Sequence, residues 1–197
     1  IFGYHRWAHF GLLFTLFLGI MAWRTIRQTR SIQKVEKRER LLNEIIEWAL
    51  DVSDCKLRPF STKFDEIADE WTRRIMEAGD LEERFFDLEN RGEYIEKIAS
   101  ALERGLGNAV GEVINNIKER KKLLFESMKF RPTPPNLDEM RKVLEILQTS
   151  SENASTLDGL SEQAKHEIAL GKNAGILNKS VSKVIEEATK IKTRYIS

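Results

Sequence analysis

Cysteine and histidine are scarce in this sequence. Its 197 residues contain one cysteine, Cys55, and three histidines, of which only His166 lies beyond the first ten residues. A single thiol cannot form an intramolecular disulfide, and it fits a reducing compartment. Without a further cysteine or a second histidine near His166, the usual ligands of a structural zinc site are missing. We therefore expect no disulfide framework, no metal centre and no cofactor.

Proline is also rare, and no segment alternates apolar and polar residues as a β-strand does. Three of the four prolines lie together at Pro132, Pro134 and Pro135, so long stretches contain no helix breaker. From Leu41 onward, apolar residues recur every three or four positions, which is the spacing of amphipathic helices. The sequence predicts an all-α fold.

The net charge is close to zero but unevenly distributed. The formal charge of the chain is +1, yet residues 24–40 contain seven Lys or Arg against two Glu and Arg6 adds one more positive charge, which leaves −5 on residues 41–197. General nucleic-acid binding needs an extended cationic surface that neutralises phosphates. The acidic body of the chain therefore argues against a nucleic-acid partner.

One segment of seventeen residues, from Trp7 to Trp23, contains no Asp, Glu, Lys or Arg. As a helix it would be roughly 25 Å long, within the range of membrane spans. Tryptophan stands at both ends, with Arg6 and Arg24 just outside, and both residue types favour the headgroup layer. We predict a single transmembrane helix here, anchored by Trp7, Phe10, Leu12, Leu13, Phe14, Leu16, Phe17, Leu18, Ile20 and Trp23.

Two other interpretations compete with the anchor. A buried core helix of a helical bundle would carry a polar residue every turn or two, whereas here Thr15 is the main interruption. A cleaved signal peptide would need a small-x-small exit, which Gly19 to Trp23 does not offer. The retained anchor is the better interpretation.

Seven cations follow the predicted span and set its expected topology. By the positive-inside rule they place the C-terminal domain in the cytoplasm and the N-terminus outside. The plain interpretation is a topology determinant near the headgroups, and the sharper one is recognition of anionic lipid. These residues are Arg24, Arg27, Arg30, Lys34, Lys37, Arg38 and Arg40.

The sequence pattern divides the chain into four expected parts. Residues 1–23 form the N-terminal flank and transmembrane helix, 24–40 a basic juxtamembrane helix, 41–79 short amphipathic helices, and 80–197 a long antiparallel hairpin with its turn at 131–136. We expect an unbroken helix over 24–54, a second that ends at Gly79, and long helices over 80–130 and 137–195. Glycine or serine clusters allow breaks at Gly92, 105–111 and 149–156.

The C-terminal region has the spacing of a coiled-coil seam. Its apolar positions alternate by four and three, which predicts an elongated bundle with coiled-coil character and offers a route to a homodimer. The seam consists of Leu177, Val181, Val184, Ala188, Ile191 and Tyr195.

No catalytic constellation stands out. The glycines from Gly105 to Gly111 have the wrong spacing and context for a dinucleotide-binding loop. Cys55 has acidic Asp54 and basic Lys56 as neighbours and is expected to be an unreactive free thiol. His166 is expected on a solvated helix face.

The expected function is therefore that of a non-enzymatic scaffold or interaction module at the cytoplasmic membrane face. Its expected partners are the lipid bilayer and an unidentified protein. The alternative is an accessory or signal-relay subunit of a membrane complex, because the helical pattern continues from the span into residues 24–54. An enzyme built on scattered carboxylates is a third class, for which no pair of residues can be nominated.

Overall fold

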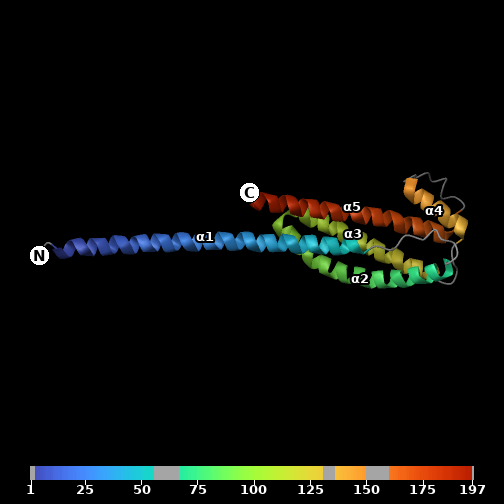
Figure 1. The fold of residues 1–197 in the computed structure, drawn as a ribbon, viewed down its shortest axis with the longest axis horizontal. Coiled ribbons are helices and arrows are strands. Elements are labelled where there is room, and N and C mark those ends of the chain that lie inside the picture. Colours follow the sequence, from blue (N-terminus) through green and yellow to red (C-terminus); the bar gives the residue numbers. More distant parts are fainter. Residues whose placement is uncertain (1–2, 56–66, 131–135, 150–159, 197) are drawn as a thin grey trace. The chain divides into compact units, whose positions relative to one another are not determined.

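The computed structural model describes residues 3–55, 67–130, 136–149 and 160–196, and all regular structure in these ranges is helical (Figure 1). The all-α prediction is confirmed for these residues. The helices are α1 (Gly3–Asp54), α2 (Ile67–Leu102), α3 (Arg104–Ser127), the short 3-10 turn η2 (Met128–Phe130), α4 (Leu137–Thr149) and α5 (Glu162–Ile196).

The chain divides into two units, residues 1–41 and 42–197, and α1 contributes to both. The first unit consists of helix α1 up to Leu41. The expected unbroken helix over residues 24–54 is confirmed, because α1 runs through the whole of this range.

The second unit is a bundle of four helix segments: the end of α1 from Leu42, and α2, α3 and α5 (Figure 1). Cross-helix pairs show that α3 and α5 run antiparallel. Glu112 binds Lys183 at 2.8 Å, while Glu103, nine residues earlier in the chain, binds Arg194, eleven residues later, at 3.4 Å. The prediction that residues 80–130 and 137–195 contain antiparallel neighbours therefore holds for the α3–α5 pair.

The core of this bundle follows the three-four spacing of apolar residues, because that spacing places them on one face of each helix. Full burial of one such side chain contributes about 1.5–3 kcal/mol. Besides residues of α1 and α5, the buried set includes Ala78, Leu81, Phe85, Leu88, Ile95 and Ala99 of α2, and Leu106, Val110, Val113, Ile117 and Leu124 of α3.

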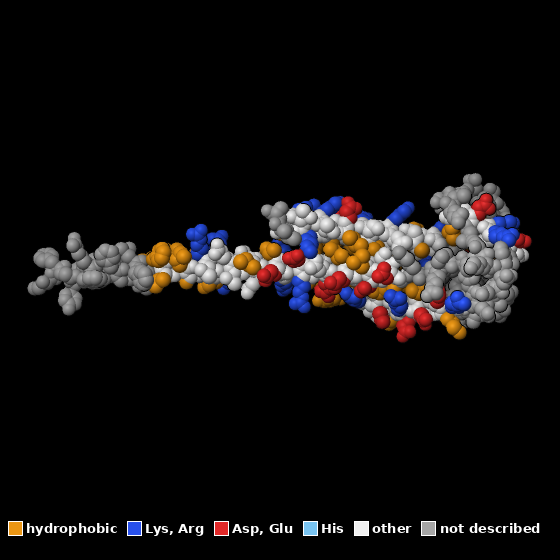
Figure 2. Space-filling model, in the orientation of Figure 1, with side chains coloured by type: hydrophobic (Ala, Val, Ile, Leu, Met, Phe, Trp, Pro, Cys, Tyr) orange, Lys and Arg blue, Asp and Glu red, His pale blue; other side chains and the backbone are white. Residues whose placement is uncertain are grey.

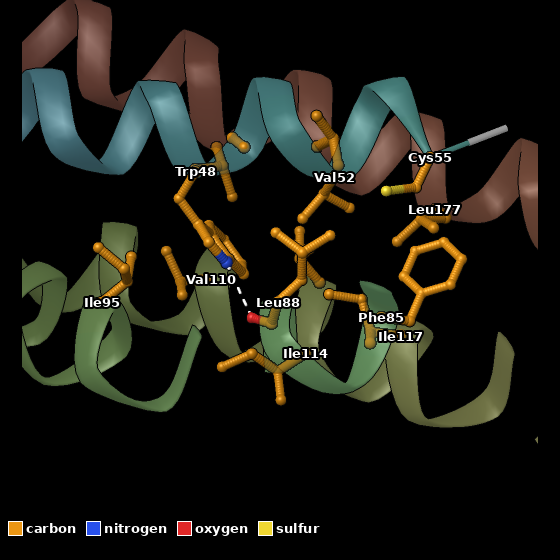
Figure 3. Packing of buried hydrophobic residues seen from close by; sticks show 14 of the residues in the cluster. Trp48, Val52, Cys55, Phe85, Leu88, Ile95, Val110, Ile114, Ile117 and Leu177 are labelled. Atoms are coloured by element: carbon orange, nitrogen blue, oxygen red, sulfur yellow. Dashed lines mark hydrogen bonds between the residues drawn. The ribbon is translucent and has the colours of Figure 1, made fainter. Parts of the chain in front are cut away.

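Trp48 of α1 is the largest fully buried side chain and joins α1 to α2 (Figure 3). Its indole Nε1 donates a hydrogen bond of 2.9 Å to the carbonyl oxygen of Leu88, so its polar atom is satisfied inside the core. Gly92 provides the space for the ring, because a Cβ at this position would lie 2.8 Å from Cζ2 of Trp48 and 3.0 Å from Cγ1 of Ile114.

The prediction that a helix ends at Gly79 is wrong. α2 does not end at Gly79 but continues to Leu102, since the buried face formed by Ala78, Leu81 and Phe85 passes straight across the glycine. Packing of this face outweighs the roughly 1 kcal/mol that one glycine costs a helix. The helix that was expected to end at Gly79 was expected to start at residue 61. Its first residues, 61–66, lie outside the described residues.

The long helix expected over 80–130 is divided, because the chain reverses at Glu103, two residues before the glycine-rich stretch 105–111 where a break was left open. This residue is extended, with φ −157° and ψ 132°, and it separates α2 from α3. Close behind it, a Cβ on Gly107 would lie 2.8 Å from Cα of Ser100. The two helix backbones thus meet at Gly107, and α2–α3 forms a hairpin that the sequence analysis placed elsewhere.

The expected last helix begins at Leu137 as predicted but is divided into α4 and α5. The proline turn at 131–135 and most of the polar stretch 149–156 lie outside the described residues. α4 packs on the start of α5 through a second apolar cluster that includes Met140, Val143 and Ile168. Of the predicted seam, the five positions from Leu177 to Ile191 are buried within the bundle and Tyr195 is exposed. A homodimer through this seam would therefore require the bundle to open.

Candidate functional site

The predicted anchor residues lie on α1, and the structure describes their side chains from Leu16 onward. Leu16, Phe17 and Trp23 expose 55%, 59% and 61% of their surface, and Leu18 and Ile20 are about half exposed. The side chains of Trp7, Phe10, Leu12, Leu13 and Phe14 lie outside the described residues, although their backbone is helical. Large apolar side chains therefore surround this part of α1 without a protein core to cover them (Figure 2).

The polar side chains just after Trp23 are satisfied within the helix itself. The hydroxyl groups of Thr25 and Thr29 each donate to a carbonyl oxygen one turn earlier, both at 2.9 Å. Ser31 donates to the carbonyl oxygen of Gln28 at 2.7 Å. The free energy needed to move a hydroxyl group out of water is smaller when the group donates a hydrogen bond to the backbone of its own helix.

All seven predicted headgroup residues, from Arg24 to Arg40, are exposed on α1. At 3.6 residues per turn, Arg24, Arg27, Arg30, Lys34, Lys37 and Arg38 fall within an arc of about 140°. Arg38 has an interaction of its own and is set apart from the other five. We call these five residues the basic face. The acidic residues of this stretch, Glu36 and Glu39, project from the other side of the helix by the same spacing.

Because the charges are segregated, the basic face has no carboxylate beside it. Among the described residues, none of its five cations forms an ion pair. Arg27 instead places its guanidinium carbon 5.5 Å from the centre of the Trp23 ring. The structure thus joins the predicted anchor to the predicted headgroup residues at this one contact.

Among the residues that the structure describes, no helix has an apolar stretch of sufficient length to cross a bilayer.

Sequence reasoning missed a buried polar cluster between α3 and α5. The Arg120 side chain is 4% exposed and donates from Nη1 to the carbonyl oxygen of Leu170. Asn173 is 6% exposed, and its Oδ1 accepts no hydrogen bond. One turn further along, Asn116 Nδ2 donates to the Ser180 hydroxyl at 3.1 Å.

A signal for this cluster exists in the spacing. Arg120 lies three residues after Ile117 and four before Leu124, and Asn173 stands in the same relation to Leu170 and Leu177. Polar residues at buried seam positions fix the register of packed helices at some cost in stability. The cluster can therefore align α3 with α5, and that is a structural role.

His166 is not on a solvated face as predicted, since its side chain is only 10% exposed. Its Nε2 lies 2.7 Å from the carbonyl oxygen of Leu123. Because a carbonyl oxygen can only accept, Nε2 carries the proton, and Nδ1 faces Glu126 at 3.9 Å. These contacts tie the start of α5 to the end of α3.

Cys55 is a buried free thiol at the end of α1 (Figure 3). Its Sγ donates to the carbonyl oxygen of Asp51 at 3.4 Å. Burial raises the pKa of the thiol above its ordinary value of 9.0, and nearby Arg84 only partly opposes this effect. A raised pKa keeps the thiol protonated, which makes it a poor nucleophile.

Two exposed aromatic rings lie on α2 and α3, each beside a lysine. Phe86 has the ammonium of Lys121 4.6 Å from its ring centre, and Phe125 has that of Lys129 at 5.7 Å. Lys121 also binds Glu89 at 2.7 Å. Both rings are slightly more than half exposed.

No group of three or more His, Cys, Asp or Glu side chains in the described ranges is arranged to hold a metal ion. Comparison with known protein families, curated proteins and solved structures found no match for this chain.

Proposed function

We propose that the chain is a single-pass membrane-anchored protein whose helical bundle, residues 42–197, acts as a non-enzymatic scaffold or interaction module at the cytoplasmic membrane face. The anchor is the apolar stretch from Trp7 to Trp23. It depends on the residues upstream of Leu16, whose charge-free sequence extends the stretch to a spanning length.

The observation that carries the proposal is the meeting of two surfaces on α1. Exposed apolar side chains run from Leu16 to Trp23 and recur at Ile26, Ile32 and Val35, and an exposed basic face starts at Arg24. Left in water, each large apolar side chain forgoes about 1.5–3 kcal/mol of burial. A bilayer covers such a surface, and its headgroup layer accommodates the tryptophan and arginine beside it.

A second candidate function, a signal-relay subunit, is favoured by the continuity of α1. This helix runs without interruption from Gly3 to Asp54, and its last turns carry Trp48 and Val52 of the bundle core. A rigid helix transmits displacement along its axis better than a flexible linker does. A flexible insert between Thr29 and Ser31 would abolish relay but leave anchoring intact.

The proposed anchor is tested by extraction of membranes that contain the full chain at alkaline pH, which removes peripheral proteins. We expect the chain to stay with the lipid, and a truncated chain that begins at Arg24 to be released. Protease added on the cytoplasmic side should digest residues after Arg24. Equal retention of the truncated chain, or protection of the bundle, would contradict the anchor or its topology.

A further inference from the structure

The basic face differs from those cations of the bundle that have a carboxylate partner. Several lysine and arginine side chains of the bundle form ion pairs. Lys190 binds Glu186 at 2.8 Å one turn away, Lys183 binds Glu112 across helices at 2.8 Å, and Arg91 binds Asp51 at 2.7 Å. Such mixing is the ordinary way to solvate a helix surface. The five cations of the basic face have no such partners among the described residues.

The segregation of charge on α1 leaves an anion-binding surface without an intramolecular anion. Glu36 and Glu39 stand on the other side of the helix. Like charges that share one helix face repel one another and destabilise a helix. The repulsion between these cations therefore destabilises the helix, and an external anion bound to the basic face would remove this destabilisation.

The position of the basic face identifies the anion. It begins directly after Trp23, whose ring is in contact with Arg27 at 5.5 Å. A tryptophan ring at the end of an apolar stretch lies at headgroup depth, so the guanidinium over it lies at the depth of lipid phosphates. We propose that Arg24, Arg27 and Arg30 bind the headgroups of anionic phospholipids in the leaflet next to Trp23. This inference rests on the proposed membrane anchor.

The length of the basic face makes the proposal specific. Arg24 and Arg30 are about 9 Å apart along the helix, and Lys37 lies about 20 Å from Arg24. Electrostatic attraction to a charged surface decays over about 8 Å at physiological ionic strength. The three arginines closest to Trp23 should therefore contribute most, and Lys37 least.

The test uses the full chain reconstituted into phosphatidylcholine vesicles with spin-labelled lipid. Electron paramagnetic resonance measures the fraction of labelled phosphatidylserine or phosphatidylcholine that the protein immobilises. The wild type should immobilise phosphatidylserine in preference to phosphatidylcholine, and added salt should reduce this preference. Arg24→Gln should lower the preference by up to about fivefold, the effect of one cation near the surface, and Lys37→Gln should lower it least.

A matched variant separates the basic face from general charge. Lys97, Lys122 and Lys142 are exposed cations of the bundle, and replacing all three by Gln removes as much charge as the triple variant Arg24→Gln, Arg27→Gln, Arg30→Gln. The arginine triple should abolish the preference and the lysine triple should leave it unchanged. Equal immobilisation of both lipids by the wild type, or equal loss in both triples, would overturn the proposal. So would equal lipid immobilisation combined with arginine-dependent capture of an acidic protein.

Vesicle flotation distinguishes failure of this inference from failure of the anchor. An anchored chain floats with vesicles of pure phosphatidylcholine. If it floats only when phosphatidylserine is present, and this requires the three arginines, the anchor fails while headgroup binding stands. If it floats with both kinds of vesicle but shows no lipid preference, the anchor stands and headgroup binding fails.

Discussion

The two units of this chain use the same helix, α1, in opposite ways. Trp23, in the first unit, exposes 61% of its surface, while Trp48, in the second, is fully buried and donates a hydrogen bond to Leu88. The five cations of the basic face form no ion pair with any described residue, whereas several cations of the bundle form ion pairs across and along its helices. In the second unit, the apolar faces of the helices are covered by other helices of the same chain. In the first unit, covering the exposed apolar side chains needs a partner outside the chain.

The largest expected difference between the units comes from truncating their tryptophans. Trp48→Ala should lower the free energy of unfolding by about 3–5 kcal/mol, because it leaves a cavity and removes the buried hydrogen bond to Leu88. Trp23→Ala should change it by less than about 0.5 kcal/mol, as exposed substitutions usually do. Urea unfolding of both variants, followed by circular dichroism, gives the comparison. Equal destabilisation would mean that Trp23 also packs within the folded chain.

Two glycine substitutions within α2 test how tightly the bundle core is packed. Gly92→Ala should destabilise it by about 1–2 kcal/mol, because the added methyl group would overlap the rigid Trp48 ring and Ile114 by more than the gain in helix propensity offsets. Gly79→Ala is the matched control, since a Cβ there has no neighbour within 4 Å. It should stabilise the bundle by about 0.4–1 kcal/mol. Thermal unfolding of both variants measures the two effects, and a stabilising Gly92→Ala would contradict the packing of Trp48.

The smallest expected effect on stability concerns the thiol of Cys55. Its folded pKa is raised above 9.0 by burial, so the folded state favours the neutral thiol. The stabilising contribution is complete below the pKa of the unfolded chain and is lost as the pH rises through the folded pKa. The midpoint of urea unfolding should therefore fall more steeply above pH 9 in the wild type than in Cys55→Ala. A parallel decline in both would show that another group titrates.

The same thiol also allows a kinetic comparison of the two units. In a Ser31→Cys variant, the new thiol lies on the exposed part of α1 and should react with iodoacetamide at the rate of a free cysteine. Cys55 should react far more slowly until denaturant is added. Mass spectrometry of tryptic peptides reports both sites in one sample. Rapid labelling of Cys55 in the folded chain would show that the end of α1 opens.

What the sequence determined about this protein is the set of helical faces. The three-four spacing predicted helices from Leu41 onward and five of the six C-terminal seam residues as buried, and the sequence also predicted the unbroken course of α1 through residues 24–54. It also located the exposed cations from Arg24 to Arg40. These features follow from period and side-chain chemistry, which a linear sequence records in full.

Only the tertiary structure decided where helices end and which polar groups are buried. Gly79 was expected to end a helix and does not, whereas α2 and α3 separate at Glu103, two residues before the glycine-rich stretch 105–111 that allowed a break. A glycine changes helix stability by about 1 kcal/mol, less than the burial of one large apolar side chain, so packing overrides it. Arg120 stands at a buried position of the spacing, but only the structure shows that the carbonyl oxygen of Leu170 in α5 accepts its hydrogen bond. A helix face can be predicted from its own residues, but its partner depends on which other segment the chain brings against it.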